Sequence, residues 1–135
     1  MPGMTHTQIE AWFEAHFPNY QRLMKLDSAE PGRARLRLRV GERQLRPGGT
    51  VSGPSMMMLA DAAVYAALLA ADGDAGDAVT SSFNIAFLKR PGPSDVLADA
   101  ELLRLGRRLV VGEVRLRSEG EDRLVAQATA TYVRP

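Results

Sequence analysis

The chain has 135 residues, a length typical of one domain with one hydrophobic core. It contains no cysteine, which excludes disulfides, thiolate catalysis and cysteine-ligated zinc and fits a reducing compartment. Its 17 basic and 16 acidic side chains give a formal net charge of +1, so no general electrostatic field would draw it to nucleic acid or to an acidic membrane. The first residues lack the basic and apolar segments of a secretory signal. We therefore expect one cytoplasmic domain over residues 1–135.

A short amphipathic helix is predicted near the N-terminus. Thr7 is a suitable N-cap, Pro18 ends the helix, and apolar residues repeat on one face at helical spacing: Ile9, Trp12, Phe13 and Phe17. A strand follows over residues 32–40, where four arginines alternate strictly with apolar side chains. The simplest interpretation of the arginine row is a solvated face, and the alternative is a phosphate or nucleic-acid surface.

A long helix is predicted from Ser52 or Gly53 to about Ala71, and its apolar character on nearly every face indicates burial. Four strands with short turns follow it, over residues 79–88, 95–105, 108–118 and 123–133. In the first of them the alternation puts Val79, Phe83, Ile85 and Phe87 on one face and Thr80, Ser82 and Asn84 on the other.

Consecutive strands joined by short turns favour antiparallel pairing. We predict an α+β fold in which a curved antiparallel five-stranded sheet wraps around the long helix, with the short helix at the N-terminus. Such a design leaves one sheet edge and part of the helix open. This favours a homo-oligomer, at least a dimer.

The long helix contains two ionisable groups that we expect to be buried, Asp61 and Tyr65, four residues apart on one face. A carboxylate in apolar surroundings is costly unless it is paired or neutralised, so Asp61 is a candidate general base. The alternative is that Asp61 faces a water-filled gap or bonds a neighbouring backbone group. At the start of this helix, free backbone N–H groups can stabilise a carbonyl oxygen that gains negative charge, and Gly53 allows close approach.

The remaining candidate residues are two histidines, two positively charged turns and several apolar residues of the long helix. His6 and His16 have no carboxylate or cysteine at metal-ligand spacing, so we expect no metal site. Two turns carry adjacent positive charge that could hold a phosphate, Lys89-Arg90 and Gly106-Arg107-Arg108, and the alternative is that these side chains are only solvated. The Met56-Met57-Met58 run is predicted to lie in the core or to line a pocket, because flexible thioethers fit irregular shapes. Possible contacts for an apolar ligand chain on the long helix are Met57, Met58, Val64 and Leu68.

Four segments resemble the PaaI-type hotdog thioesterase family: G-G-T-V-S-G-P-S-M-M-M-L-A-D-A-A, V-T-S-S-F-N-I-A-F-L-K-R-P, L-G-R-R-L-V-V-G-E-V and L-V-A-Q-A-T-A-T-Y. They occur in the family's order and spacing, and the match extends over about residues 32–133. The resemblance implies a hotdog fold and hydrolysis of an acyl-CoA, without a cofactor because CoA is part of the substrate. It also implies a homotetramer built from two dimers.

In that family an Asp or Glu nine residues after a preferred His acts as general base or nucleophile, and here this position is Asp61. Gly53 stands where a backbone N–H polarises the thioester carbonyl, and Thr80 where some members use a hydroxyl of the partner subunit to orient the attacking water. The substrate contacts that we expect are Arg46, Ser52, Met57, Tyr65 and Asn84, and those to the CoA phosphates are Arg90, Gly106, Arg107 and Arg108.

The chain departs from the family pattern at three positions. Ser52 replaces the usual His, Pro54 replaces the second Gly, and Arg46 stands where several members carry Asn or Gln. Arg46 would contact an acidic acyl group or pair with Asp61. The leading hypothesis is an acyl-CoA thioesterase whose site forms between subunits, and the alternative is a non-catalytic protein that binds acyl-CoA or another acyl ligand. A hotdog hydratase would need a catalytic His near the long helix, but no His lies beyond position 16. A hotdog transcriptional regulator would need a DNA-binding segment, and the N-terminal helix is too short and too little basic for that role.

Overall fold

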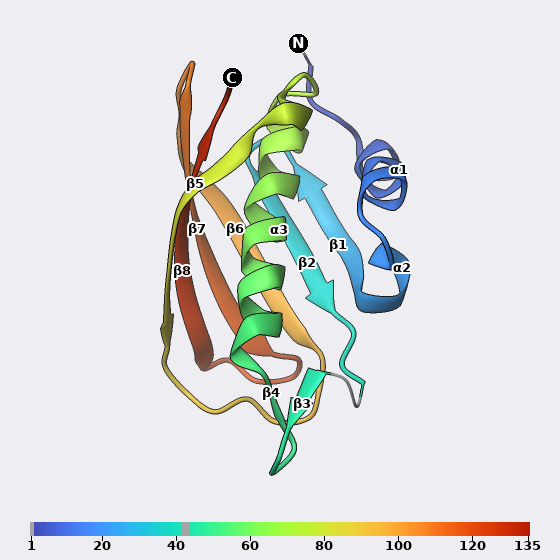
Figure 1. Ribbon diagram of the computed structural model, residues 1–135, viewed down its shortest axis with the longest axis vertical. Helices are drawn as coiled ribbons and strands as arrows, with labels where there is room; N and C mark the ends of the chain where they lie inside the picture. The colour runs from blue at the N-terminus through green and yellow to red at the C-terminus, as the bar shows by residue number, and fades with distance from the viewer. Residues whose placement is uncertain (1, 42–43) are drawn as a thin grey trace.

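The computed structural model describes residues 2–41 and 44–135. A curved antiparallel six-stranded sheet wraps around the central helix α3 (Gly53–Ala71) (Figure 1). The strands, in their spatial order, are β1 (Met24–Glu30), β2 (Arg33–Leu38), β6 (Val96–Leu105), β7 (Leu109–Ser118), β8 (Leu124–Val133) and β5 (Val79–Phe87). The remaining elements are α1 (His6–His16), α2 (Tyr20–Leu23), the 3₁₀ turn η2 (Ala75–Asp77) and the small hairpin β3 (Leu45–Arg46) and β4 (Thr50–Val51).

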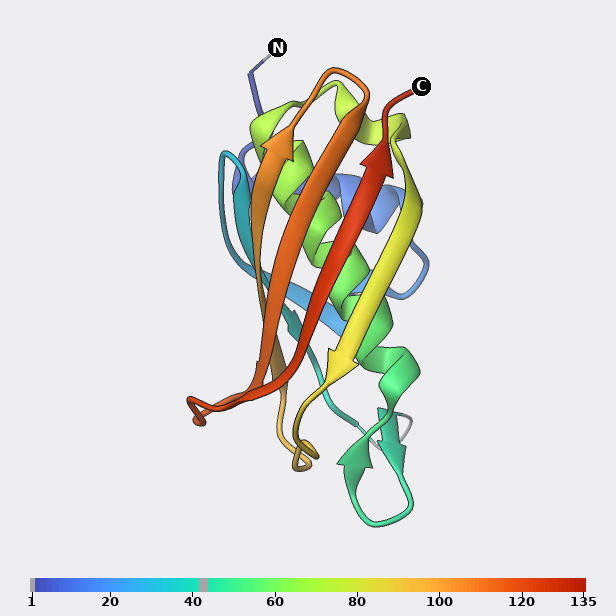
Figure 2. The same ribbon diagram turned by 90° about the vertical axis from the view of Figure 1, so that its left-hand side faces the viewer.

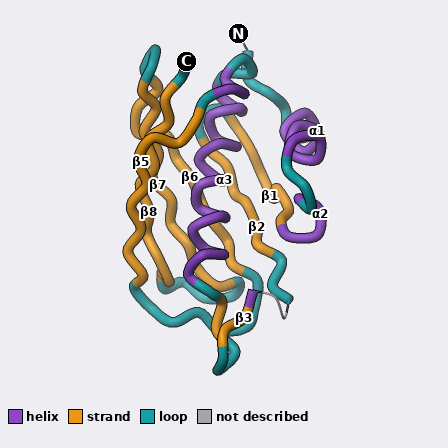
Figure 3. Tube along the Cα trace, in the orientation of Figure 1, coloured by secondary structure: helices purple, strands orange, loops and turns teal. Residues whose placement is uncertain are grey.

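The three α-helices of the described residues lie on the concave side of the sheet, with α1 and α2 beside α3 and in front of β1 (Figures 1 and 3). Strand β5 pairs with β8 alone and forms one edge of the sheet (Figure 2). The predicted hotdog architecture is therefore confirmed. The four strands after the central helix have the predicted bounds to within one residue at either end.

The predicted number of strands was wrong, because β1 makes a sixth strand of the main sheet. Met24 and Leu26 in β1 are buried, but a register shift between Leu26 and Ser28 interrupts the alternation. The second half of the strand, D-S-A-E, also lacks the β-branched and aromatic residues that mark strands. A bulge of this kind removes the period of two on which the prediction depended.

The predicted N-cap of the first helix was also wrong. Thr5, not Thr7, caps α1, since its side chain accepts a hydrogen bond from the backbone N–H of Gln8 at 3.2 Å. The Gln8 side chain in turn accepts from the backbone N–H of Thr5 at 2.9 Å, which completes a capping box. The T-x-x-Q pattern of this box was the signal in the sequence.

Helix α3 is the core of the fold, as its composition predicted. By length and composition it could cross a membrane, but 61% of its most apolar window is buried inside the protein. The sheet approaches it closely at Gly112 in β7, where an added Cβ atom would lie 2.8 Å from Cγ1 of Val64. This contact is typical of the core helix of a globular domain.

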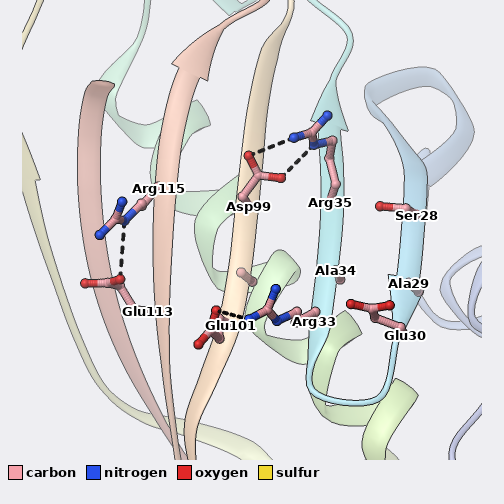
Figure 4. Close-up of a pocket in the computed structure, with 11 residues that line it drawn as sticks. Ser28, Ala29, Glu30, Arg33, Ala34, Arg35, Asp99, Glu101, Glu113 and Arg115 are labelled. Atoms are coloured by element: carbon pink, nitrogen blue, oxygen red, sulfur yellow. Dashed lines mark hydrogen bonds and ion pairs between the residues drawn. The ribbon is translucent and has the colours of Figure 1, made fainter. Parts of the chain in front are cut away.

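The arginines of β2 lie on the outer face of the sheet, where acidic residues on neighbouring strands pair with them (Figure 4). Arg35 bonds Asp99 at 2.6 Å, and Arg37 bonds Asp27, Asp95 and Glu119 at 2.6 to 3.1 Å. These pairs neutralise Arg35 and Arg37 with carboxylates from β1, from β6 and from the turns beside β6 and β7. A hollow of about 610 Å³ on this face is lined by the same kind of ion pairs, including Arg115 with Glu113.

Candidate functional site

The main apolar cleft, of about 660 Å³, lies between α1 and α2 on one side and α3 and the start of β5 on the other. Aromatic residues from both sides line it, and a carboxylate lies in its wall. The lining includes Trp12, Phe17, Met58, Asp61, Tyr65 and Thr80. The sequence therefore folds so that the one acidic residue of α3 opens onto an apolar space.

Asp61 is held by two hydroxyl groups. Thr80 Oγ1 donates to Oδ1 of Asp61 at 2.8 Å, and the Tyr132 hydroxyl donates to the same oxygen at 2.9 Å. The Tyr132 hydroxyl also lies 3.0 Å from the main-chain oxygen of Asp61. Thr80 and Asp61 belong to the same chain here, whereas the resemblance implied a hydroxyl from a partner subunit.

The two hydroxyls meet at Asp61 because of a bulge in β5. Thr80 is the cross-strand neighbour of Tyr132, and the register shifts between Thr80 and Ser82. Without this shift, Thr80 would lie on the opposite face from Phe83, as the alternation predicted. The bulge reverses the predicted faces of Thr80 and Val79, so Thr80 points to α3 while the Val79 side chain is 61% exposed.

A chain of aromatic contacts forms the floor of the cleft. Tyr65 stacks on Phe13 with ring centroids 5.8 Å apart and on Tyr132 at 5.9 Å. Trp12 Nε1 donates to the Tyr65 hydroxyl at 2.9 Å, and that hydroxyl donates to the main-chain oxygen of Gly76 at 2.6 Å. Burial raises the pKa of Tyr65, so this hydroxyl stays protonated and keeps both bonds.

The N-terminal end of α3 lies away from these aromatic residues and forms a second part of the candidate site. Ser52 is the N-cap, and its Oγ accepts from the backbone N–H of Ser55 at 3.3 Å and donates to Ser55 Oγ at 2.8 Å. Gly53 is the first helical residue, where backbone N–H groups have no acceptor within the helix. The Phe87 ring packs against Gly53, and an added Cβ atom would lie 3.3 Å from it.

The β3–β4 hairpin lies at this same end. Arg90 donates to the main-chain oxygen of Gly48 at 3.3 Å, and Thr50 Oγ1 donates to that of Pro91 at 2.9 Å. Gly53 and Arg90 border one small hollow of about 360 Å³. Arg46, in β3, is exposed, and within the described part of the chain it makes no ion pair with Asp61.

The second predicted phosphate-binding turn is far from the first. Gly106, Arg107 and Arg108 connect β6 to β7 near the chain termini, whereas the β3–β4 hairpin lies at the opposite end of the molecule (Figure 2). Arg107 and Arg108 are exposed. One subunit therefore does not bring these arginines together with Arg90.

The remaining predicted substrate contacts lie in different parts of the structure. Met57 is 41% exposed on α3 but does not border the cleft, whereas the neighbouring Met58 does. Val64 and Leu68 are fully buried against the sheet and have no access to the cleft. Asn84 is exposed on β5, opposite Thr129 of β8.

Several residues of the site were missed from the sequence: Tyr132 and Gly76 were not singled out, and Trp12 and Phe17 were predicted only as part of the apolar face of the first helix. Tyr132 shares the inward parity of the buried alanines of β8, which was a signal for its orientation but not for its contact with Asp61. Gly76 lies in the 3₁₀ turn η2, and its importance follows from two contacts: the packing of Trp12 against it and the hydrogen bond from the Tyr65 hydroxyl to its main-chain oxygen. In residues 2–41 and 44–135 no cluster of His, Asp or Glu has the arrangement of a metal site.

Comparisons with known proteins agree with this architecture. The model of the thioesterase superfamily matches residues 48–125. A proposed thioesterase of a Silicibacter species is 42% identical, with a TM-score of 0.90 over 100% of this chain and 94% of that one. A variant of the phenylacetic acid degradation protein PaaI from Thermus thermophilus is 30% identical, with a TM-score of 0.76 over 87% of this chain and 99% of that one.

Zebrafish thioesterase superfamily member 2, at 24% identity, shares the fold, with a TM-score of 0.85 over 98% of this chain and 100% of that one. Among curated proteins the comparison finds no match. The superfamily model covers more than half of the chain and includes α3, Asp61 and Thr80. The chain belongs to the thioesterase superfamily, as a hotdog protein of the PaaI type.

Proposed function

We propose that the protein hydrolyses acyl-CoA thioesters and that Asp61 is its catalytic carboxylate. The observation that carries this proposal is the position of Asp61, whose carboxylate opens onto an apolar cleft and is oriented by Thr80 and Tyr132. A carboxylate in this setting is suited to act as a general base or as a nucleophile at a carbonyl.

As a general base, Asp61 takes a proton from water while the water oxygen attacks the thioester carbonyl carbon. The resulting tetrahedral intermediate carries its negative charge on the former carbonyl oxygen, and the Gly53 N–H stabilises this charge. The C–S bond then breaks, and the CoA sulfur receives the proton held by Asp61. The products are the free acid and CoA. As a nucleophile, Asp61 would instead attack the carbonyl carbon, the C–S bond would break with release of the CoA thiolate, and water would hydrolyse the resulting mixed anhydride to the free acid and Asp61.

The acyl group would occupy the cleft beside Trp12, Phe17 and Met58. The walls are predominantly apolar, and a volume of about 660 Å³ is within the range of small-molecule sites. Arg90 and the turn with Arg107 and Arg108 would hold the CoA phosphates from different subunits, since one subunit separates them. A protein of Streptococcus mutans with this fold, 24% identical over 83% of this chain and 88% of that one, with a TM-score of 0.74, was solved bound to acetyl-CoA.

A second copy of the chain would complete the site. Gly53 and Asp61 are eight residues apart on α3, about 12 Å along the helix axis at 1.5 Å per residue. They border different hollows, whereas both groups must reach one thioester within hydrogen-bond distances of about 3 Å. The free edge of β5 and the exposed Phe87 and Leu88 beside Gly53 favour pairing with a second β5 strand. The two helices would then run antiparallel, with Gly53 of one near Asp61 of the other.

The test of activity is thiol release from a panel of short, medium, long and aromatic acyl-CoAs, with wild type compared with Asp61→Asn. We expect turnover of at least one class and a loss of about 10²-fold or more in the variant. Equal rates in the two proteins would contradict the role of Asp61. If neither exceeds background while an acyl-CoA raises Tm, the protein binds acyl-CoA without catalysis.

The shared site is tested by mixing two inactive variants. Gly53→Pro removes the N–H donor at a position where proline is compatible with the helix start, and Asp61→Asn removes the carboxylate. If the site combines Gly53 and Asp61 from different subunits, mixed dimers contain one intact site and an equal mixture regains about a quarter of the wild-type rate. No recovery after subunit exchange would show that both groups act within one subunit.

A further inference from the structure

The two carboxylate oxygens of Asp61 differ in their hydrogen bonds. Oδ1 accepts hydrogen bonds from Thr80 at 2.8 Å and from Tyr132 at 2.9 Å. In the part of the chain that the structure describes, no protein group donates to Oδ2. The two donors therefore leave a single oxygen of Asp61 free for chemistry.

We propose that Tyr132 is a positioning residue that anchors Oδ1 of Asp61 and thereby makes Oδ2 the oxygen that reacts. This inference rests on the proposed thioesterase function. A carboxylate on a single bond can rotate, and rotation changes the distance from each oxygen to the substrate. Since small displacements of a reacting group reduce rates strongly, a carboxylate held in one orientation supports faster catalysis than one that rotates.

Tyr132 is suited to this role because the core fixes its ring. Its side chain is 4% exposed, it lies in β8 between β5 and β7, and its ring stacks on Tyr65 with an interplanar angle of 21°. Thr80, by contrast, is exposed on the edge strand. Of the two donors, Tyr132 is therefore the one whose position does not depend on the sheet edge.

The hydroxyl of Tyr132 also remains a donor under all relevant conditions. Burial raises the pKa of Tyr132, and the negative charge of Asp61 raises it further. The phenol is consequently neutral at the pH of an enzyme assay. A neutral O–H donor and a charged acceptor form one of the stronger hydrogen bonds in proteins.

A purely structural role for Tyr132 would have different consequences. Tyr132→Phe keeps the ring and its stacking but removes the hydroxyl, so a structural role predicts lower Tm with little change in kcat. A positioning role predicts that kcat falls on the order of 10- to 100-fold while KM changes little, because the hydroxyl contacts Asp61 and not the substrate.

The experiment measures kcat, KM and Tm for wild type and Tyr132→Phe on the best acyl-CoA of the panel. Tyr20→Phe is the matched control, since it also removes the hydroxyl of a buried tyrosine that borders the same cleft and donates to a carboxylate, here Glu10 at 2.5 Å, without contacting Asp61. The loss of kcat in Tyr132→Phe must clearly exceed that of the control. The same loss should be absent when Tyr132→Phe is added to Asp61→Ala, whose residual rate no longer depends on the carboxylate.

A second measurement does not depend on turnover. The decrease in Tm caused by Tyr132→Phe should shrink in the Asp61→Ala background, because the bond is already lost there. Equal decreases in both backgrounds would overturn the inference. So would an active wild type whose Tyr132→Phe variant matches Tyr20→Phe in kcat. A wild type inactive on the whole panel would overturn the proposed function, and the positioning role with it.

Discussion

Trp12 and Tyr65 are joined by a hydrogen bond of 2.9 Å that links the N-terminal helix to the central helix. The indole packs against Gly76, where an added Cβ atom would lie 2.4 Å from the ring. The Tyr65 hydroxyl donates to the main-chain oxygen of the same glycine at 2.6 Å. α1, α3 and the loop before β5 therefore meet at one point on the wall of the cleft.

The first prediction concerns this link. Trp12→Phe should lower the free energy of unfolding by about 1–2 kcal/mol, because it removes one hydrogen bond and some buried apolar surface. Chemical unfolding measures this change. In a Tyr65→Phe background, which lacks the acceptor, the cost of Trp12→Phe should be smaller by about 1 kcal/mol. An identical cost in both backgrounds would show that the bond does not contribute.

The second prediction concerns the approach of the sheet to α3. Gly112→Ala should destabilise the protein by about 1–3 kcal/mol, since the new methyl group would lie 2.8 Å from Val64 Cγ1 and 3.4 Å from Leu102 Cδ2. Gly92→Ala is the matched control, because nothing lies within 4 Å of its added Cβ atom. If thermal unfolding shows the same Tm for both variants, the helix and sheet are less tightly packed than described.

The third prediction concerns the arginine row. Arg37 is one-fifth exposed and pairs with three carboxylates, whereas Arg33 is 61% exposed and pairs with Glu101 alone. Arg37→Ala should therefore cost about 2 kcal/mol of stability, and Arg33→Ala about 0.5 kcal/mol or less. Urea unfolding at low salt compares the two. Equal small effects would mean that the network around Arg37 is only a solvated surface.

The fourth prediction concerns pH. A hydrogen bond from the Asp74 backbone N–H, and then the Arg134 guanidinium, hold the pKa of Asp72 below its ordinary value of 3.8. A lowered pKa stabilises the folded state above the ordinary value, and the stabilisation is lost as the pH falls through the folded value. Wild type should exceed Asp72→Asn in Tm at neutral pH, and the gap should close below about pH 4. Asp74→Asn, which retains the backbone donor, should show no such closing gap.

Much of the architecture was predictable because local periodicity decides it. The apolar character of residues 56–71, interrupted by Asp61, predicted a buried central helix, and the period of two predicted four long strands and the buried face of β2. Asp61 could be singled out since it is the only acidic residue in that helix. The strand β1 and the cap at Thr5 were missed where a bulge or a short motif replaced the simple period.

The site itself depended on contacts between distant residues. Tyr132 reaches Asp61 across 71 positions of the chain, and Trp12 reaches Tyr65 across 53. The bulge in β5 turned Thr80 toward Asp61, against the alternation in the sequence.

By itself, then, the sequence determined the order of elements, the buried helix and the carboxylate most suited to chemistry, because side-chain periodicity is a local property of the backbone. Only the tertiary structure decided which hydroxyls hold Asp61, and that one subunit separates Gly53 from Asp61 and Arg90 from Arg107. Strand register and helix packing set these relationships, and both arise from the balance of contacts over the whole core.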